Sequence, residues 1–252
     1  MLQRNDFRIE ICANGVESCM AAQQGGADRV ELCAGIPEGG TTPSFGEILT
    51  ARKVLTTTRL HVIIRPRGGD FLYTDMETER MIADIDIARE LGADGVVFGC
   101  LTEKGDIDMD RNATLMSHTA GMATTFHRAF DHCNNPQTAL EQLVTLGFDR
   151  VLTSGQQPTA PQGAPLLAEL YRQADGRIAI LAGCGVNETN IHQLFLDTDV
   201  REYHFSAREL TKSNMLYRND KVYMGAPDAD ELSLPYTTVR RVEDTIAALM
   251  KQ

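Results

Sequence analysis

Two glutamate–cysteine pairs are the residues in this sequence best placed to do chemistry. They are Glu10-Ile11-Cys12 and Glu31-Leu32-Cys33. Residues two apart in a β-strand share a face, so each glutamate would lie on the same face as its cysteine, with the apolar neighbour opposite. Two adjacent cysteine sulfurs could hold a soft monovalent cation such as Cu(I). From the residues alone, the better interpretation is that both cysteines fill buried apolar space.

A second group of residues could do acid–base chemistry. If the protein is an enzyme, Glu10, Glu31 and His127 are the candidates for general acid and general base. Ionisable groups inside a fold cost free energy unless they are paired or solvated, so their gathering favours a polar ligand or a reaction. A structural ion network that fills the same space is the alternative, and it stays open.

The segment Arg65-Pro66-Arg67-Gly68-Gly69-Asp70 has the composition of an anion-binding loop. Arginine offers a fork of donors to carboxylate or phosphate, and glycines let backbone N–H groups approach an anion. We therefore predict Arg65 and Arg67 as ligand contacts. A structural turn in which Asp70 pairs with an arginine is almost equally compatible with the spacing. Further predicted ligand contacts at strand ends are Arg128, Ser154 and His204.

Three copies of one short pattern indicate how the chain positions these residues. The copies are Gly26-Ala27-Asp28-Arg29-Val30, Gly92-Ala93-Asp94-Gly95-Val96 and Gly147-Phe148-Asp149-Arg150-Val151. Each follows an amphipathic, helix-like segment and precedes an apolar run. Glycine just after a helix can adopt the left-handed conformation that ends it, and a β-branched residue then begins a strand. The repeat therefore indicates alternating helices and strands.

Eight strands and eight helices result when this alternation is extended along the chain. Several strand segments are continuous apolar runs, which is typical of parallel strands covered on both faces. The expected strands are residues 7–12, 29–33, 60–65, 95–98, 123–127, 150–153, 178–182 and 202–205. The expected helices are residues 16–24, 45–55, 75–91, 111–119, 136–146, 164–173, 190–196 and 239–250.

This pattern predicts the α/β class and a closed (β/α)₈ TIM barrel, formed as a single domain over residues 1–252. An open, doubly wound sheet is the alternative, but no glycine-rich dinucleotide turn follows the first strand. In a barrel the carboxyl ends of the strands meet at one mouth. The acidic, basic and sulfur-bearing residues named above are therefore expected to converge there.

One long stretch, residues 207–237, breaks the alternation between the eighth strand and the last helix. Its length favours an interface, a lid or a ligand contact. Asn219-Asp220, between segments 215–218 and 222–224, predicts a hairpin turn. The loops 183–187 and 204–207 stand where barrels often bind phosphate, although the usual short helix is not evident after the eighth strand.

Charge and composition exclude several classes of partner. A formal net charge of −11 opposes binding to nucleic acid or to an anionic membrane. No apolar run approaches the ~20 residues needed to cross a bilayer. The first residues lack the apolar stretch of a secretory signal, and the 6 cysteines form no C-x-x-C pair. We therefore expect a cytoplasmic protein in a reducing compartment.

Several segments resemble those of the CutC copper homeostasis family. They include Glu10-Ile11-Cys12, Ala27-Asp28-Arg29-Val30-Glu31-Leu32-Cys33, Ile64-Arg65-Pro66-Arg67-Gly68-Gly69-Asp70-Phe71, Thr125-Phe126-His127-Arg128-Ala129-Phe130-Asp131 and Tyr217-Arg218-Asn219. The resemblance runs through nearly the whole chain in order. It implies a (β/α)₈ barrel, a cytoplasmic location, self-association with a dimer as the first expectation, and a role in copper homeostasis.

In that family, cysteines matching Cys12 and Cys33 have been proposed as Cu(I) ligands. The resemblance therefore makes Cu(I) the expected metal of this chain and these two sulfurs its ligands. The chain departs from the family pattern at Cys184, where relatives usually have a small residue, and at Ala13-Asn14-Gly15. An enzyme acting on a small anionic metabolite, such as a sugar phosphate, remains the alternative function.

Overall fold

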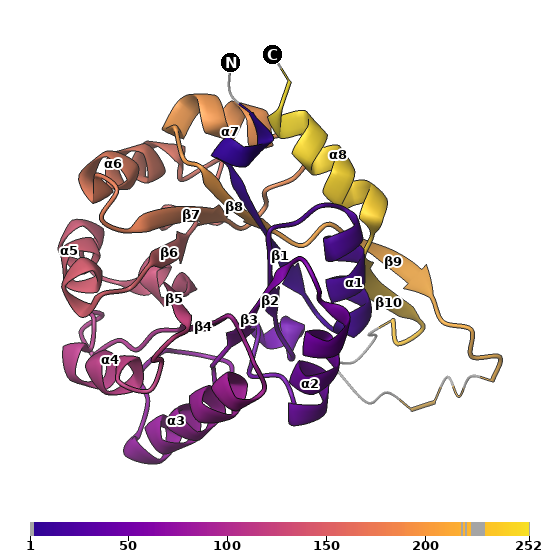
Figure 1. The fold of residues 1–252 in the computed structure, drawn as a ribbon, viewed down its shortest axis with the longest axis horizontal. Coiled ribbons are helices and arrows are strands. Elements are labelled where there is room, and N and C mark those ends of the chain that lie inside the picture. The colour runs from indigo at the N-terminus through magenta and orange to yellow at the C-terminus, as the bar shows by residue number, and fades with distance from the viewer. Residues whose placement is uncertain (1–2, 218, 220, 223–229, 252) are drawn as a thin grey trace.

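Eight parallel strands form a closed barrel in chain order, and the last strand is hydrogen-bonded back to the first (Figure 1). The structure is a computed structural model that describes residues 3–217, 219, 221–222 and 230–251. The barrel strands are β1 (Arg8–Ala13), β2 (Arg29–Leu32), β3 (Arg59–Ile63), β4 (Gly95–Phe98), β5 (Ala123–Phe126), β6 (Arg150–Thr153), β7 (Ala179–Gly183) and β8 (Glu202–Phe205). The predicted (β/α)₈ barrel is confirmed.

An outer ring of α-helices surrounds the strands (Figure 1). The helices of the described residues are α1 (Val16–Gln24), α2 (Phe45–Val54), α3 (Asp75–Glu90), α4 (Met109–Met116), α5 (Pro136–Leu146), α6 (Ala164–Ala174), α7 (Ile191–Thr198) and α8 (Val239–Leu249). The start of α5 illustrates the local reason for such bounds. Asn135 accepts a hydrogen bond from the Thr138 N–H and caps the helix, and Pro136 follows at the first helical position.

The predicted bounds agree closely with the observed ones, and β3 shows why some differ. The sequence predicts a strand that reaches Arg65, but β3 ends at Ile63. The Arg65 N–H donates to Thr42 Oγ1 (3.0 Å), and the Thr42 N–H donates to the Arg65 carbonyl (3.0 Å). Because this backbone pairs with a loop, the ladder to the next strand stops before Arg65.

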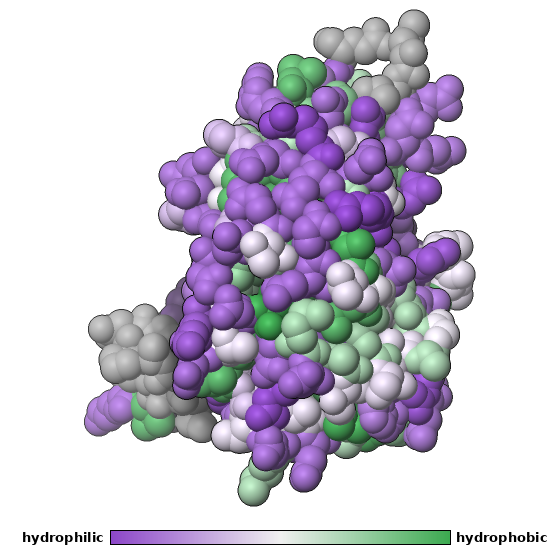
Figure 2. Space-filling view, turned by 90° about the vertical axis from the view of Figure 1, so that its left-hand side faces the viewer, coloured by the Kyte–Doolittle hydropathy of each residue, from purple (hydrophilic) through white to green (hydrophobic). Residues whose placement is uncertain are grey.

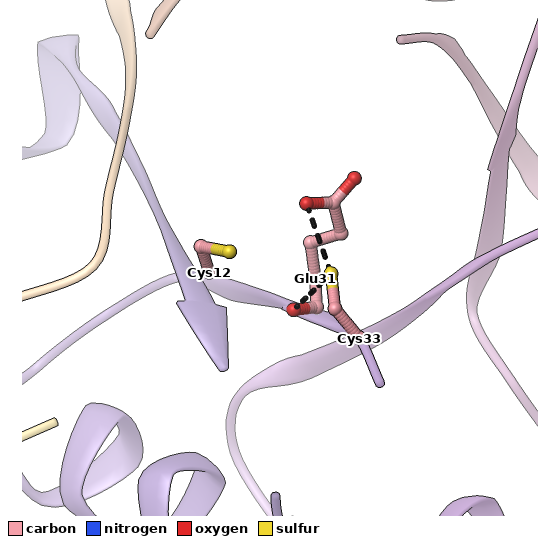
Figure 3. Close-up of side chains that lie close together, drawn as sticks. All are labelled: Cys12, Glu31 and Cys33. Atoms are coloured by element: carbon pink, nitrogen blue, oxygen red, sulfur yellow. Dashed lines mark hydrogen bonds between the residues drawn. The ribbon is translucent and has the colours of Figure 1, made fainter. Parts of the chain in front are cut away.

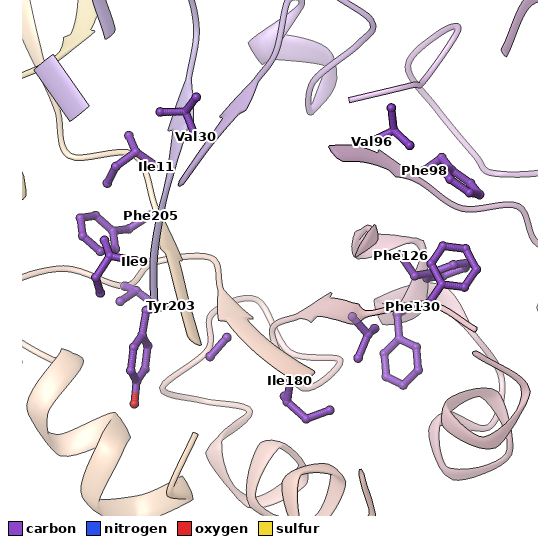
Figure 4. Packing of buried hydrophobic residues seen from close by; sticks show 14 of the residues in the cluster. Ile9, Ile11, Val30, Val96, Phe98, Phe126, Phe130, Ile180, Tyr203 and Phe205 are labelled. Carbon is purple, nitrogen blue, oxygen red and sulfur yellow. The ribbon is translucent and has the colours of Figure 1, made fainter. Parts of the chain in front are cut away.

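The apolar side chains of the strands pack outward against the helices. Figure 4 shows Ile9, Ile11, Val30, Tyr203 and Phe205 within this buried core. Alternation turns the residues between them toward the inside of the barrel. The two-sided pattern of the first two strands is as the sequence predicts, and it places the polar and sulfur-bearing side chains inside.

The repeated Gly-x-Asp pattern has a structural role at the amino-terminal end of the barrel. Asp28 Oδ2 accepts from the Ile9 N–H (2.7 Å), and the Asp28 N–H donates to the Ile9 carbonyl (3.0 Å). Asp94 makes the same pair of bonds to Leu60, and Asp149 makes it to Thr124. Each aspartate therefore joins the start of β2, β4 or β6 to the strand before it.

A two-stranded antiparallel hairpin lies outside the barrel, beside α1 and α8 (Figure 1). Its strands are β9 (Arg208–Lys212) and β10 (Ser233–Thr237). The sequence places a hairpin at Asn219-Asp220 instead. That expectation is wrong for residues 215–217, which form no strand, and residues 218, 220 and 223–224 lie outside the described part of the chain. A turn signal is local, whereas strand pairing depends on segments more than twenty residues apart.

Hydrophilic side chains cover most of the outer face that Figure 2 presents, with apolar residues scattered among them. This surface is consistent with the content of charged residues, 23% of the chain, which is ordinary for a globular protein. Among the described residues, no helix combines the length and apolar character needed to cross a bilayer.

Candidate functional site

The register of β1 and β2 brings the two glutamate–cysteine pairs together. Cys12 pairs with Glu31 across the two strands, and the Cys33 N–H donates to the Ala13 carbonyl (2.9 Å). The two sulfurs and a carboxylate oxygen of Glu31 all lie within 4.8 Å of one another. Figure 3 shows Cys12 turned toward Glu31 and Cys33 from the neighbouring strand. We call Cys12, Glu31 and Cys33 the thiol cluster.

Cys12 has the surroundings of a thiolate. Its pKa is well below the usual value, chiefly because the Cys33 thiol donates a hydrogen bond to it, and His204 and Arg208 add to the effect against the opposing influence of burial. Arg208 donates to the Cys12 sulfur (3.2 Å) and carbonyl (3.0 Å). The hydrogen bond to Cys12, together with burial, raises the pKa of Cys33. Of the two sulfurs, Cys12 is therefore the one that ionises more readily, and Cys33 holds its proton more tightly.

Glu31 differs from Glu10 in its charge state because its surroundings differ. Burial raises the pKa of Glu31 to about 8, so this carboxyl group is mostly protonated at neutral pH. Its Oε2 lies 3.4 Å from the Cys33 sulfur, and its buried Oε1 has no partner among the described residues. Burial would also raise the pKa of Glu10, but Arg29 and His204 hold it below the usual range.

Glu10 belongs to an ion network beneath the thiol cluster. It pairs with Arg29, which also contacts Glu202 (2.9 Å), and its Oε1 lies 2.7 Å from His204 Nδ1. Burial disfavours the charged form of His204, yet hydrogen bonds with Cys12 and Glu10 raise its pKa well above the usual value. His204 thus links the network to the thiol cluster.

A cavity of about 730 Å³ opens at the carboxyl ends of the strands, next to the thiol cluster. Seven predicted site residues line it: Cys12, Glu31, Cys33, Arg65, His127, Arg128 and His204. The structure therefore brings these residues to one mouth. Glu10, Arg67 and Ser154 do not line the cavity.

Intramolecular bonds explain the placement of Arg67 and Ser154. Arg67 pairs with Glu77 (2.6 Å) and Asp70 (2.9 Å), the latter as in the structural turn that the sequence left open. Ser154 is fully buried; it accepts from Arg128 (3.1 Å) and contacts Asp131 (3.0 Å) through its hydroxyl. Both side chains support the residues around the cavity.

Arg65 lines the cavity but also holds its loops. Its guanidinium donates to the backbone carbonyls of Glu38 (2.7 Å), Gly40 (2.8 Å) and Gly69 (2.8 Å). The loop after β2 and the loop after β3 are thereby tied together. An arginine that satisfies three carbonyls has a clear structural role in addition to its predicted ligand contact.

Two arginines at the cavity are absent from the sequence prediction. Arg208 begins β9 inside the stretch 207–237, and Arg241 lies in α8, where it pairs with Glu188 (2.9 Å). The unusual length of the stretch 207–237 is the feature of the sequence that could have indicated Arg208 as a site residue. The position of Arg241 on a regular helix carries no comparable signal.

Comparisons with known proteins identify the group to which this barrel is related. The model of the CutC family matches residues 7–209, most of the chain. This chain belongs to the CutC family. The resemblance seen in the sequence is confirmed.

Individual CutC relatives match over almost their whole length. A family protein CutC from Bacteroides thetaiotaomicron is 61% identical, over 96% of this chain and 98% of its own. The human copper homeostasis protein cutC homolog is 48% identical, over 98% of this chain and 90% of its own. The crystal structure of CutC from Streptococcus agalactiae superposes with a TM-score of 0.76 at 34% identity, covering 79% of this chain and 98% of that one.

Proposed function

We propose that this CutC chain binds Cu(I) through the sulfurs of Cys12 and Cys33, as part of copper homeostasis. The observation that carries the proposal is the thiol cluster, with two sulfurs and a carboxylate oxygen within 4.8 Å at the wall of an open cavity. The name of the human relative supports the link to copper.

The donor set suits a soft cation. Thiolate ligands select Cu(I), whereas hard cations prefer several oxygen ligands. A metal–sulfur bond measures ~2.3 Å, so an ion held between two sulfurs needs them about 4.6 Å apart or closer. The two sulfurs lie within 4.8 Å of each other, which is close to this separation.

Protons compete with the metal for the same sulfurs. The lowered pKa of Cys12 favours its thiolate form, whereas the raised pKa of Cys33 means that its thiol must lose a proton when the metal binds. Affinity is therefore expected to increase as pH rises. The cations of His204 and Arg208 stabilise the sulfur charge before the metal arrives.

An anaerobic Cu(I) titration against a chromophoric chelator tests the proposal. We expect the parent protein to bind one Cu(I), and the Cys12→Ser/Cys33→Ser variant to lose at least about two orders of magnitude in affinity, because hydroxyls are poor ligands for a soft cation. Cys184→Ser is the matched control, since Cys184 lines the same cavity outside the thiol cluster. Equal affinity of the parent and the double variant would rule out this site.

We also propose that the protein is cytoplasmic and forms a dimer. Exposed apolar side chains on and after β9, at Leu210, Met215, Leu216 and Tyr217, support self-association. Sedimentation velocity should give a dimer for the parent and a shift toward monomer for Leu210→Lys. A parent that sediments as a monomer at every concentration would contradict the dimer.

A further inference from the structure

The cavity is much larger than a metal ion needs. A water molecule occupies ~30 Å³, and pockets for small organic ligands span about 300–1,000 Å³. The cavity here measures about 730 Å³. The thiol cluster occupies only the part next to β1 and β2, so most of the volume serves another purpose.

Another part of the mouth is formed by residues that follow β3, the neighbour of β2, and by residues that follow β5. In the closed strand order, β5 lies four strands from β1, directly across the ring. Phe71 connects the side chains there: its ring lies 5.0 Å from His127, 5.5 Å from His132 and 5.0 Å from the Arg65 guanidinium carbon. We call Arg65, Phe71, His127, Arg128 and His132 the distal wall.

Within the distal wall, His127 has a ring N–H that is free to donate a hydrogen bond. The Ala129 N–H donates to His127 Nδ1 (3.3 Å). Glycine at position 99 leaves room for this ring, because the Cβ of any other residue there would lie 3.0 Å from Nδ1. Burial and the nearby Arg65 lower the pKa of His127 to about 3, so the ring is neutral and its hydrogen sits on Nε2. Nε2 is buried and has no partner among the described residues.

Other unpaired groups gather around the same cavity. Among the described residues, seven buried side-chain nitrogen or oxygen atoms lack a partner, and five belong to residues that line it. These five atoms are Glu31 Oε1, Arg65 Nε, His127 Nε2, Arg208 Nε and Arg241 Nε. Buried polar atoms are normally satisfied, so their concentration at one cavity indicates a polar ligand. Four of the five are N–H donors, which require an acceptor.

The charge of the lining also favours an acceptor. Four arginines and two glutamates line the cavity. Arg128 and Arg241 are paired with Asp131 and Glu188. Arg65 donates to backbone carbonyls, which leave its charge unneutralised. The charge of Arg65 at this cavity would attract an anion against the general field of a chain of net charge −11.

We propose that the distal wall binds a small organic anion, whose carboxylate or phosphoryl oxygens accept from His127 Nε2–H and face Arg65 and Arg128. The apolar ring of Phe71 would contact the carbon skeleton of the ligand. The contacts proposed for this anion do not include Cys12 or Cys33, so we expect its binding not to require the metal.

Isothermal titration calorimetry on the metal-free protein tests this proposal with three probes: citrate, ribose 5-phosphate and inorganic phosphate. We expect citrate or ribose 5-phosphate to bind the parent, and His127→Phe to bind that probe about tenfold or more weakly, because a buried hydrogen bond to a charged group is lost. His61→Phe is the matched control. His61 is equally buried, has a lowered pKa and an unpaired Nδ1, but does not line the cavity.

Arg128→Gln provides a second variant at a more exposed position, because the Arg128 side chain is 42% exposed. It should weaken the same probe by a similar factor, whereas His61→Phe should keep the parent affinity. Binding of either organic probe that is unchanged in both His127→Phe and Arg128→Gln would overturn the proposal. The proposal would also be overturned if the parent bound neither organic probe. The same holds if the parent bound inorganic phosphate as tightly as it bound the organic probes.

The Cys12→Ser/Cys33→Ser variant separates this proposal from the copper proposal. We expect it to lose Cu(I) and to bind the anion probe as the parent does. Loss of anion binding in this double variant, with the protein still folded, would contradict an independent distal wall.

Discussion

Two buried histidines, His61 and His127, show how single residues in this barrel depend on their surroundings. Both rings are almost fully buried, and burial with nearby arginines lowers each pKa to about 3. His204 is also buried, but contacts with Cys12 and Glu10 raise its pKa. The three histidines therefore differ in charge at neutral pH because of their partners and not because of their burial.

This difference predicts how stability depends on pH. In the unfolded chain His61 has a pKa near 6.5, so below that pH the unfolded state binds a proton that the folded state does not, and stability falls as pH falls. In urea unfolding at pH 7 and pH 5, we expect the parent to lose up to about 2 kcal/mol relative to His61→Gln. The comparison cancels contributions from Glu31 and other groups. A difference between the two proteins that does not change with pH would contradict the neutral state of His61.

At the scale of elements, the aspartates of the Gly-x-Asp repeat fasten pairs of strands. Asp28, Asp94 and Asp149 each accept from a backbone N–H on the preceding strand while their own N–H donates to the same residue. These bonds lie at the end of the barrel opposite the cavity. The repeat therefore serves the stability of the barrel and leaves the mouth free for function.

Asp149→Ala tests the role of these aspartates. The substitution leaves the Thr124 N–H without its side-chain acceptor, so we expect a loss of about 1–3 kcal/mol in the free energy of unfolding. Asp197→Ala on the exposed surface of α7 is the control and should change stability by less than about 0.5 kcal/mol. Equal effects of the two substitutions, measured by urea unfolding, would show that the strand bond contributes nothing.

At the scale of the whole molecule, the thiol cluster joins the two ends of the chain. Cys12 lies on β1, and its sulfur contacts Arg208 at the start of β9, 196 positions later. A metal ion bound at this point would bind the closed barrel more tightly than the unfolded chain, because only the barrel holds the two sulfurs together. Binding is thereby linked to global stability.

Cu(I) is therefore expected to raise the melting temperature of the parent. A free concentration of about 100 times Kd adds ~2.7 kcal/mol, which corresponds to about 5–10 °C for a domain of this size. Anaerobic differential scanning calorimetry should show this shift for the parent and for Cys184→Ser. The same shift in Cys12→Ser/Cys33→Ser would place the stabilising metal elsewhere.

The alternation of strands and helices could be predicted from the sequence because it depends on local patterns of residues. Glycine after three of the helices, apolar runs of strand length and residues two apart on a face are all decided by neighbours along the chain. The same patterns placed Glu10 and Cys12, and Glu31 and Cys33, on the inner face of two adjacent strands. The barrel and one wall of its cavity follow from these features.

Tertiary structure alone decided which groups meet at the mouth and in what charge state. The contact of Arg208 with Cys12, the three carbonyls around Arg65 and the pairing of β9 with β10 all join distant segments. Glu10 and Glu31 occupy equivalent positions in their strands, yet only Glu31 lines the cavity and is protonated. Periodicity specifies the face of the strand on which a residue lies. Strand register, loop path and burial specify the partners of that residue, and its pKa depends on those partners.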